Sequence, residues 1–518
     1  MKSKLNRPLS ADGVEDARRR LGELLAARGA WFLREGRDAF STVELRRGEW
    51  ELSAARGSLL LSFWGEAGAR TWRVAAWARE GEKVLLEATR RAGAERARLE
   101  LVPRASLAES KQSVAEARRA ACARLSALVC AARAGSKVER AALSAGARRG
   151  EPGRYARILL KDGRTLFAAT GPVVELGAEE TDAFLASALL WFMRLRESAS
   201  ARSPRELWLV IPPKLRAPVS ERISLLREDL RAAIRLSEVD EGQRHLTHVE
   251  ACESGEPSLS QTPRLSRPPK AEEWSELARR VVALAPEALD VVRSRRGETL
   301  RYHGLAFARV RRLLGTERLW FGVGRGKSRR LLDESNWPEL LKLLEELHEH
   351  RRAEAHDRRH ALYAAAPEAW LESLLRRDIT RLDPGLRLAP LHAQFRAARD
   401  TTGASRPVDL LALRRDGRLV VIELKVSEDA ALPLQGADYW RRVSAHQRAG
   451  HLTSARLFGD AELSPDPPLV YLVAPLLRFH RSFQILARCL SPDIQTYRFD
   501  LNEDWRTAVR VARRCALT

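Results

Sequence analysis

The stretch Pro407–Lys425, PVDLLALRRDGRLVVIELK, decides the fold of the C-terminal part of this chain. Two runs rich in Leu, Val and Ile flank an Asp-Gly pair at Asp416-Gly417. An Asp-Gly between apolar β-formers is the strongest short-range signal for a β-hairpin. We therefore predict two paired strands, Val408–Arg414 and Leu419–Lys425.

Besides Arg414 at the turn, three charged side chains lie in these strands, and the loop length decides whether they meet. Glu423 and Lys425 share one face because side chains alternate along a strand. A two-residue loop would pair Asp409 with Leu424, whereas a three-residue loop with Gly417 in the left-handed conformation pairs Asp409 with Glu423. Like charges directly opposite each other are destabilising, but carboxylates suit Mg²⁺ or Mn²⁺. Only the three-residue loop creates such a cation site.

Helices are predicted on both sides of the hairpin. LPLQGADYWRRV, Leu432–Val443, follows it, and Gln435 and Tyr439 lie one turn apart on one face of this helix. APEAWLESLLRRDI precedes it, with a proline near its first turn. Two acids lie four residues apart on one face of that preceding helix, Glu368 and Glu372.

This ordered set of residues resembles the core of the PD-(D/E)xK nuclease superfamily, and the Gln-x-x-x-Tyr spacing is similar to its RecB-like branch. The family's proline is displaced by one residue, to Pro407. The resemblance covers Ala361–Asn502 and implies a restriction-endonuclease-like α-β-β-β-α-β core that hydrolyses phosphodiester bonds of nucleic acid, DNA rather than RNA. After the first helix, the three strands and the helix Leu432–Val443, we expect three more elements. They are a buried strand, a helix and a last edge strand: Pro468–Ala474, Phe479–Leu490 and Gln495–Leu501.

The resemblance also implies roles for individual residues. Asp409 and Glu423 would hold one or two Mg²⁺ or Mn²⁺ ions, the cofactor of the reaction. The main-chain carbonyl of Leu424 would be a further ligand. The acid supplied by the first helix would be Glu372, in Glu-x-x-Leu, with Glu368 as the alternative.

The catalytic set implied by the resemblance is Asp409, Glu423, Lys425, Gln435 and Tyr439. Lys425 would position or activate the attacking water, while Gln435 and Tyr439 would orient substrate or metal-bound water. The plainer interpretation makes Glu423 and Lys425 a solvated pair on an edge strand. LVVIEL is typical of a buried central strand, where an unpaired carboxylate would cost several kcal/mol, so the sequence favours the site.

Composition points to a polyanionic partner. The 518 residues carry a formal charge of +22, with Arg dominating the basic set, which favours nucleic acid through phosphate contacts. A GC-rich genome would also raise the Arg content. The five cysteines form no Cys-x-x-Cys pair, and no apolar leader or membrane-spanning run occurs, so we expect a cytoplasmic protein without a membrane partner. No helicase or ATPase segment is recognisable; a second copy of the chain and a separate unwinding protein are the protein partners considered.

We predict an α/β multidomain protein with N-terminal β-rich and α/β regions. Its segments are a β-rich domain with an N-terminal helix (1–105), a helical connector (106–148), an α/β domain (149–250), a Ser/Pro linker (251–272), a basic α/β domain (273–355) and the nuclease-like domain (356–518). The segment 149–250 repeats the order hairpin, helix, strand, but Phe167–Thr170 stands where Glu-x-Lys should fall. We therefore expect an unrelated α/β domain there rather than a degenerate copy.

Two regions combine basic and aromatic residues. Residues 274–330 contain 14 Lys and Arg against 5 Asp and Glu, a pattern that favours a nucleic-acid groove over an ordinary solvated face. The predicted binding residues are Arg301, Arg309, Trp320, Arg325 and Lys327. The turn around Lys327 lacks the first glycine of a phosphate loop but could bind a backbone phosphate. In 1–105 several tryptophans crowd together, and we interpret them as core rather than as a base-stacking platform.

Overall fold

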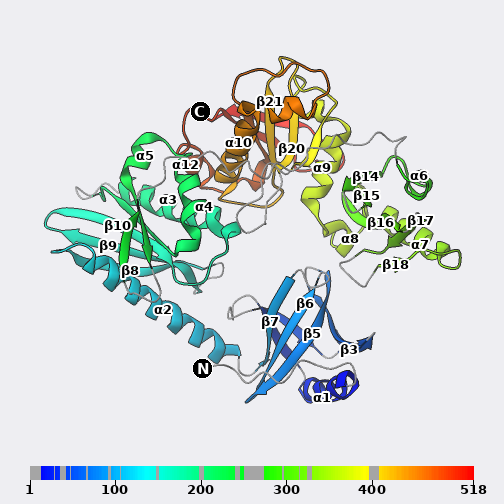
Figure 1. Cartoon of the computed structure of the whole chain (residues 1–518), viewed down its shortest axis with the longest axis horizontal. Helices are drawn as coiled ribbons and strands as arrows, with labels where there is room; N and C mark the ends of the chain where they lie inside the picture. The colour runs from blue at the N-terminus through cyan, green and yellow to red at the C-terminus, as the bar shows by residue number, and fades with distance from the viewer. Residues whose placement is uncertain are drawn as a thin grey trace. The chain divides into compact units, whose positions relative to one another are not determined.

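The computed structural model describes residues 13–28, 30–35, 42–46, 48–55, 57–65, 68–90, 95–104, 107–146, 151–197, 203–239, 245–249, 274–294, 297–313, 316–323, 329–395 and 408–517. In these residues the chain is a mixed α/β protein with four sheets (Figure 1). It divides into two compact units, Met1–Ala117 with Glu273–Ala365, and Arg118–Glu272 with Ala366–Thr518. No helix of the described residues is long and apolar enough to cross a membrane.

The first unit begins with an antiparallel half-barrel. Its seven strands have the order β2-β1-β7-β6-β5-β4-β3. Helix α1 (Val14–Ala26) buries Leu21 and Leu25 in the core of this sheet. Trp31 and Trp72 are buried in the same core, as the core interpretation of the tryptophans predicts. The strands are β1 (Ala30–Glu35), β2 (Thr42–Arg46), β3 (Trp50–Ala55), β4 (Ser58–Gly65), β5 (Gly68–Glu80), β6 (Lys83–Arg90) and β7 (Glu95–Pro103).

The same unit contains a five-stranded antiparallel meander, which holds most of the basic region. Its buried face carries apolar residues such as Leu300, Val310 and Leu319, packed against helices α6 and α7. The elements are α6 (Glu276–Val282), β14 (Leu289–Ser294), β15 (Gly297–Tyr302), β16 (Leu305–Leu313), β17 (Thr316–Phe321), β18 (Arg330–Leu331), α7 (Trp337–His350) and α8 (Ala361–Ala364).

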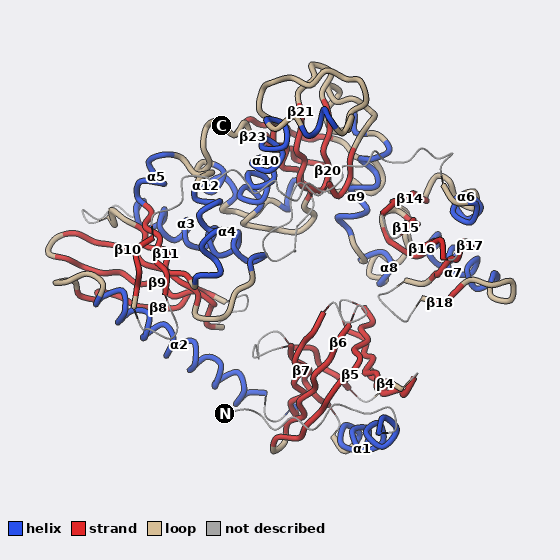
Figure 2. The backbone as a smooth tube through the Cα atoms, viewed as in Figure 1, coloured by secondary structure: helices blue, strands red, loops and turns tan. Residues whose placement is uncertain are grey.

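The second unit opens with a six-stranded sheet of order β13-β12-β11-β10-β9-β8 (Figure 2). The helix predicted over 106–148 is wrong in its second half. Helix α2 (Leu107–Ala131) ends earlier, and the next residues pair with β9 as an edge strand, because pairing to a sheet outweighs the helical propensity of Ala and Arg. The other elements are β8 (Lys137–Ala145), β9 (Pro152–Asp162), β10 (Thr165–Pro172), α3 (Thr181–Glu197), β11 (Leu207–Ile211), α4 (Arg216–Ile223), α5 (Glu228–Ala233), β12 (Ile234–Val239) and β13 (Leu246–Val249).

The second six-stranded sheet has the order β19-β20-β21-β22-β23-β24. The predicted order of helix, three strands, helix and strand is confirmed. The prediction that Gln495–Leu501 forms an edge strand is wrong, because β24 pairs along its outer side. The helix predicted over Phe479–Leu490 is shorter in the structure, where α12 covers Phe483–Ala487. The elements are α9 (Pro367–Arg377), β19 (His392–Phe395), β20 (Val408–Leu413), β21 (Leu419–Leu424), α10 (Leu432–Arg448), α11 (His451–Ser454), β22 (Leu469–Pro475), α12 (Phe483–Ala487), β23 (Thr496–Leu501) and β24 (Val511–Ala516).

The loop between β20 and β21 has three residues, as the site requires. The amide of Arg414 donates to the carbonyl of Arg418 at 2.9 Å, which closes the loop. Gly417 has φ +82°, in the left-handed region that favours glycine. A Cβ atom at this position would lie 2.7 Å from the carbonyl oxygen of Glu462. Both the backbone conformation and the space therefore require glycine here.

Replacing Gly417 by alanine is expected to lower the free energy of unfolding by about 2 kcal/mol or more, since the left-handed conformation alone costs an L-residue about 1–2 kcal/mol and the new methyl group meets backbone. The matched control is Gly450→Ala, at φ +68° with no atom within 4 Å of the added Cβ. This control should lose only the conformational part. Urea unfolding of both variants measures the difference, and equal losses would contradict the prediction.

Candidate functional site

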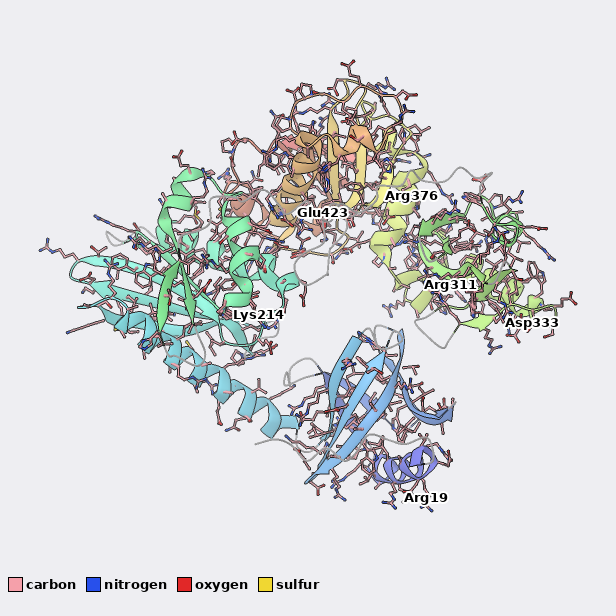
Figure 3. All side chains as sticks on the ribbon, in the orientation of Figure 1. Arg19, Lys214, Arg311, Asp333, Arg376 and Glu423 are labelled. Carbon is pink, nitrogen blue, oxygen red and sulfur yellow. The ribbon has the colours of Figure 1, made fainter. Side chains whose placement is uncertain are left out.

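The hairpin brings Asp409 and Glu423 opposite each other. Leu410 pairs with Ile422, so the preceding residue Asp409 faces Glu423 across the ladder, and the predicted register is confirmed. The Glu423 side chain is 2% exposed, and Figure 3 labels it on its strand. Its Oε1 accepts from Nζ of Lys425 at 2.7 Å. Asp409 Oδ2 accepts from the amide of Leu424 at 2.9 Å.

Helix α9 adds a third carboxylate. Glu368, in the first turn, is half-buried. Burial raises its pKa above the ordinary value, Lys425 opposes this rise, and Asp409 reinforces it. Glu368 therefore shares an electrostatic environment with the hairpin. Glu372 is buried on the same helix at 4% exposure; its role as a metal ligand stays a prediction.

The charges of this cluster do not balance. Burial raises the pKa of Glu423 well above its ordinary value, Asp409 raises it further, and Lys425 offsets only part of the rise. Burial would lower the pKa of Lys425, but the carboxylates of Glu423, Asp409 and Glu368 raise it above its ordinary value. The ammonium group thus stays charged. With all three acids ionised, the cluster holds an excess of negative charge in a largely dry environment.

A divalent cation fits this donor set. Hard carboxylate oxygens are the ligands of Mg²⁺ and Mn²⁺, and Oε2 of Glu423 is buried without a hydrogen-bond partner in the described residues. Among these residues, however, no three Asp, Glu, His or Cys side chains are already arranged around a common ion position. Two of the carboxylate oxygens already have hydrogen-bond partners: Lys425 donates to one oxygen of Glu423, and the amide of Leu424 donates to one oxygen of Asp409. Binding an ion would require these side chains to adjust.

Helix α10 contacts Asp429, an acid that was not predicted from the sequence. Gln435 is 6% exposed, and its Nε2 donates to Oδ2 of Asp429 at 3.0 Å. Asp429 also accepts from the amide of Ala431 at the start of the helix, and its charge reaches Glu368. An Asp just before a helix is an N-cap signal, and this signal could have identified it. Tyr439 is 5% exposed and packs in the core beside β20 and β21.

Three of the five nucleic-acid-binding residues predicted in the first unit lie on one face of the meander. Arg309 pairs directly with Trp320, and Thr299 pairs with Arg309. The alternate residues of these strands are core, so Arg309 and Trp320 lie on the outer face, and alternation places Arg301 there too. Arg311, labelled in Figure 3, continues this outer face. The other two predicted binding residues, Arg325 and Lys327, lie outside the described residues, as does Pro407.

Comparison of the chain with protein-family models, with curated proteins and with solved structures gave no match in any of the three. The assignment of the site therefore depends on the geometry of its own residues. The observations that bear on it are the facing carboxylates Asp409 and Glu423, the ammonium of Lys425 and the half-buried Glu368.

Proposed function

We propose that the chain is a metal-dependent nuclease that hydrolyses phosphodiester bonds of nucleic acid, with DNA as the favoured substrate. The observation that carries this proposal is the pair Asp409 and Glu423 facing each other beside Lys425. A buried strand has no structural use for two facing carboxylates. The order of α9, β19–β21, α10 and β22 is also that of the PD-(D/E)xK core, which supports a restriction-endonuclease-like fold.

In this proposal the acids of the cluster bind the cation, and Lys425 acts on the attacking water or the phosphate. Asp409, Glu423 and an acid of α9 would hold the cation, with the Leu424 carbonyl as a further ligand. When bound, Mg²⁺ polarises the scissile phosphate and lowers the pKa of a bound water. Lys425 would orient that water or stabilise the charge that develops on the phosphate. Gln435 would keep Asp429 in place beside Glu368.

Incubation of the purified full chain with circular DNA, linear DNA, single-stranded DNA and RNA tests this proposal. Each substrate is combined with Mg²⁺, Mn²⁺ or EDTA. Cleavage that requires the metal and stops with EDTA supports the nuclease. If intact nucleic acid is recovered under all conditions while a salt-sensitive mobility shift appears, the catalytic proposal fails.

The outer face of β15–β17 is expected to contribute to nucleic-acid affinity. In the double variant Arg309→Gln/Arg311→Gln, the slope of log affinity against log salt concentration should fall by about 2, since each lost phosphate contact removes about one unit. The control is Arg19→Gln on α1, whose exposed guanidinium pairs with Asp16. Fluorescence anisotropy over a salt series provides the measurement. An unchanged slope in the double variant would exclude this face as a binding surface.

A second function is supported by the same basic face. The chain could be a nucleic-acid-binding or scaffold protein in which the C-terminal fold serves as a docking module. The observation in its favour is that no three ligands are arranged around an ion in the described residues. Calorimetric titration with Mn²⁺ separates the two functions, because the docking module predicts no heat of binding that depends on Glu423.

A further inference from the structure

The two six-stranded sheets of the second unit have the same topology. In each, the first three strands are antiparallel, the third, fourth and fifth are parallel, and the sixth is antiparallel to the fifth. Each has a 17-residue helix between its third and fourth strands, α3 and α10. A helix also precedes the first strand of each, α2 and α9. The shared topology of the two sheets argues against the expectation of an unrelated domain at 149–250.

The strand registers show which residues correspond. Strands β12 and β23 have six residues each, and aligning them end to end sets Ile234 at the position of Thr496. Their partners in the neighbouring strands are Leu207 and Val470, and the next partners are Ala168 and Val421. Counting along β10 and β21 from this pair sets Thr170 at the position of Glu423 and Pro172 at that of Lys425.

The first sheet does not carry the acidic site. Thr170 pairs with Arg157, which therefore stands at the position of Asp409. The Thr170 hydroxyl is buried and donates to the carbonyl of Ala156. The Arg157 guanidinium lies over the Trp191 ring at 5.9 Å. Strand β10 contains no Asp, Glu or Lys at any position. The described residues of 118–249 thus repeat the topology without a carboxylate at the positions of Asp409 and Glu423.

The two copies meet across a local twofold arrangement. The segments that follow α4 and α12 form an antiparallel bridge between Leu226 and Leu490. Two reciprocal hydrogen bonds flank it, from the Arg227 amide to the Cys489 carbonyl at 3.0 Å and from the Ser491 amide to the Leu225 carbonyl at 2.8 Å. Residues of α3, α4, α10 and α12 share one buried apolar core. The copies pack like the two halves of a dimer within one chain.

A buried ion cluster crosses this interface and ends on the helix of the candidate site. Arg222 on α4 is 6% exposed, and its Nη2 lies 3.1 Å from Oδ2 of Asp438 on α10. Its Nε donates to Asp182 of α3 at 2.9 Å. On α10 itself, Arg441 and Arg442 also contact Asp438, at 3.0 and 2.6 Å. Burial would raise the pKa of the Asp438 carboxyl, but the charges of Arg222, Arg442 and Arg441 keep it below its ordinary value.

We propose that the copy that lacks the acidic site is a positioning domain, in which Arg222 holds Asp438 and thereby sets the position of helix α10 beside the acidic cluster. The proposal rests on the proposed nuclease function. Asp438 lies one turn after Gln435, which donates a hydrogen bond to Asp429, and the charge of Asp429 acts on Glu368. The contact that Arg222 makes with α10 is the one to Asp438, so the proposed effect on the site passes through α10.

Arg222→Met and Arg222→Lys in the full chain test this role, with Lys214→Met as the control, because Lys214 forms an exposed ion pair with Glu175 in the same copy. Arg222→Met should reduce kcat by roughly tenfold or more while KM for DNA changes little, since a small displacement of a positioned group costs this much. Amide hydrogen exchange should accelerate within 432–448 and stay parental in β20 and β21. Arg222→Lys should restore part of both effects.

Several outcomes would overturn the proposal. One is parental exchange of α10 in Arg222→Met; another is equal acceleration over both sheets, which would make the cluster a general stabiliser. If Arg222→Met does not fold, Arg222→Lys decides, and parental kcat and exchange in that variant count against positioning. If the parent chain cleaves no substrate, the nuclease function fails, whereas the exchange of α10 still tests the mechanical role of Arg222 independently.

Discussion

Replacing Lys425 by alanine is expected to reduce cleavage by about 10²–10³-fold, the loss typical of removing one group that stabilises transition-state charge. Its ammonium lies 2.7 Å from Oε1 of Glu423 and is 16% exposed as a side chain, so water cannot easily take its place. Asp409→Ala should have an effect at least as large, because it removes a carboxylate that faces Glu423. Initial rates on a fluorescent DNA substrate with saturating Mg²⁺ measure both variants.

The controls for these variants separate chemistry from folding. Arg415→Ala removes an exposed cation from the turn of the same hairpin and should cleave at the parental rate. Both site variants should keep the far-ultraviolet circular dichroism and the DNA affinity of the parent, since the basic face of β15–β17 is untouched. Cleavage by Lys425→Ala at the parental rate would mean that this lysine has no role in the reaction.

Replacing Glu423 by glutamine should abolish cleavage yet stabilise the metal-free protein at neutral pH. The ionised carboxylate is buried and faces Asp409, so its charge costs free energy that a neutral amide avoids. Lys425 keeps Asp409 and Glu368 as electrostatic partners in this variant. Thermal and urea unfolding in EDTA measure the gain.

The stability that Glu423→Gln gains over the parent protein should increase with pH. The folded-state pKa of Glu423 is raised above the ordinary value of 4.5, so the folded protein binds the proton more tightly than the unfolded chain. Its contribution to stability is therefore full below about pH 4.5 and is lost as the pH rises through the folded-state value. The advantage of Glu423→Gln over the parent should be small in acid and grow toward neutral pH. An advantage that shrinks as the pH rises would contradict the burial of this charge.

Metal binding should reverse the stability order of the parent protein and Glu423→Gln. A ligand that binds only the folded state stabilises it by about 2.7 kcal/mol at a hundred times its Kd. Mg²⁺ or Mn²⁺ should therefore raise the Tm of the parent and leave that of Glu423→Gln nearly unchanged. This measurement does not depend on cleavage. Equal shifts in both proteins would place the cation elsewhere.

The hairpin, the order of the elements around it and the loop length at which Asp409 and Glu423 face each other could all be predicted from the sequence. These features are local. The period of two along a strand and the demand of a three-residue loop for a left-handed glycine together leave one register that unites the carboxylates. The helices before and after the hairpin follow from periodicity and from the proline in the first turn of α9.

The tertiary structure was needed to show that Glu368 shares the electrostatic environment of the hairpin, because Glu368 and Glu372 lie on one face of the helix and their depth depends on how α9 packs. It also showed that residues 137–145 form a strand and that β24 covers β23, since edges are set by pairing partners distant in sequence. The contact between Arg222 and Asp438 joins residues 216 positions apart. No local pattern encodes such a pair, because it forms only where two separately folded sheets pack their helices into one core.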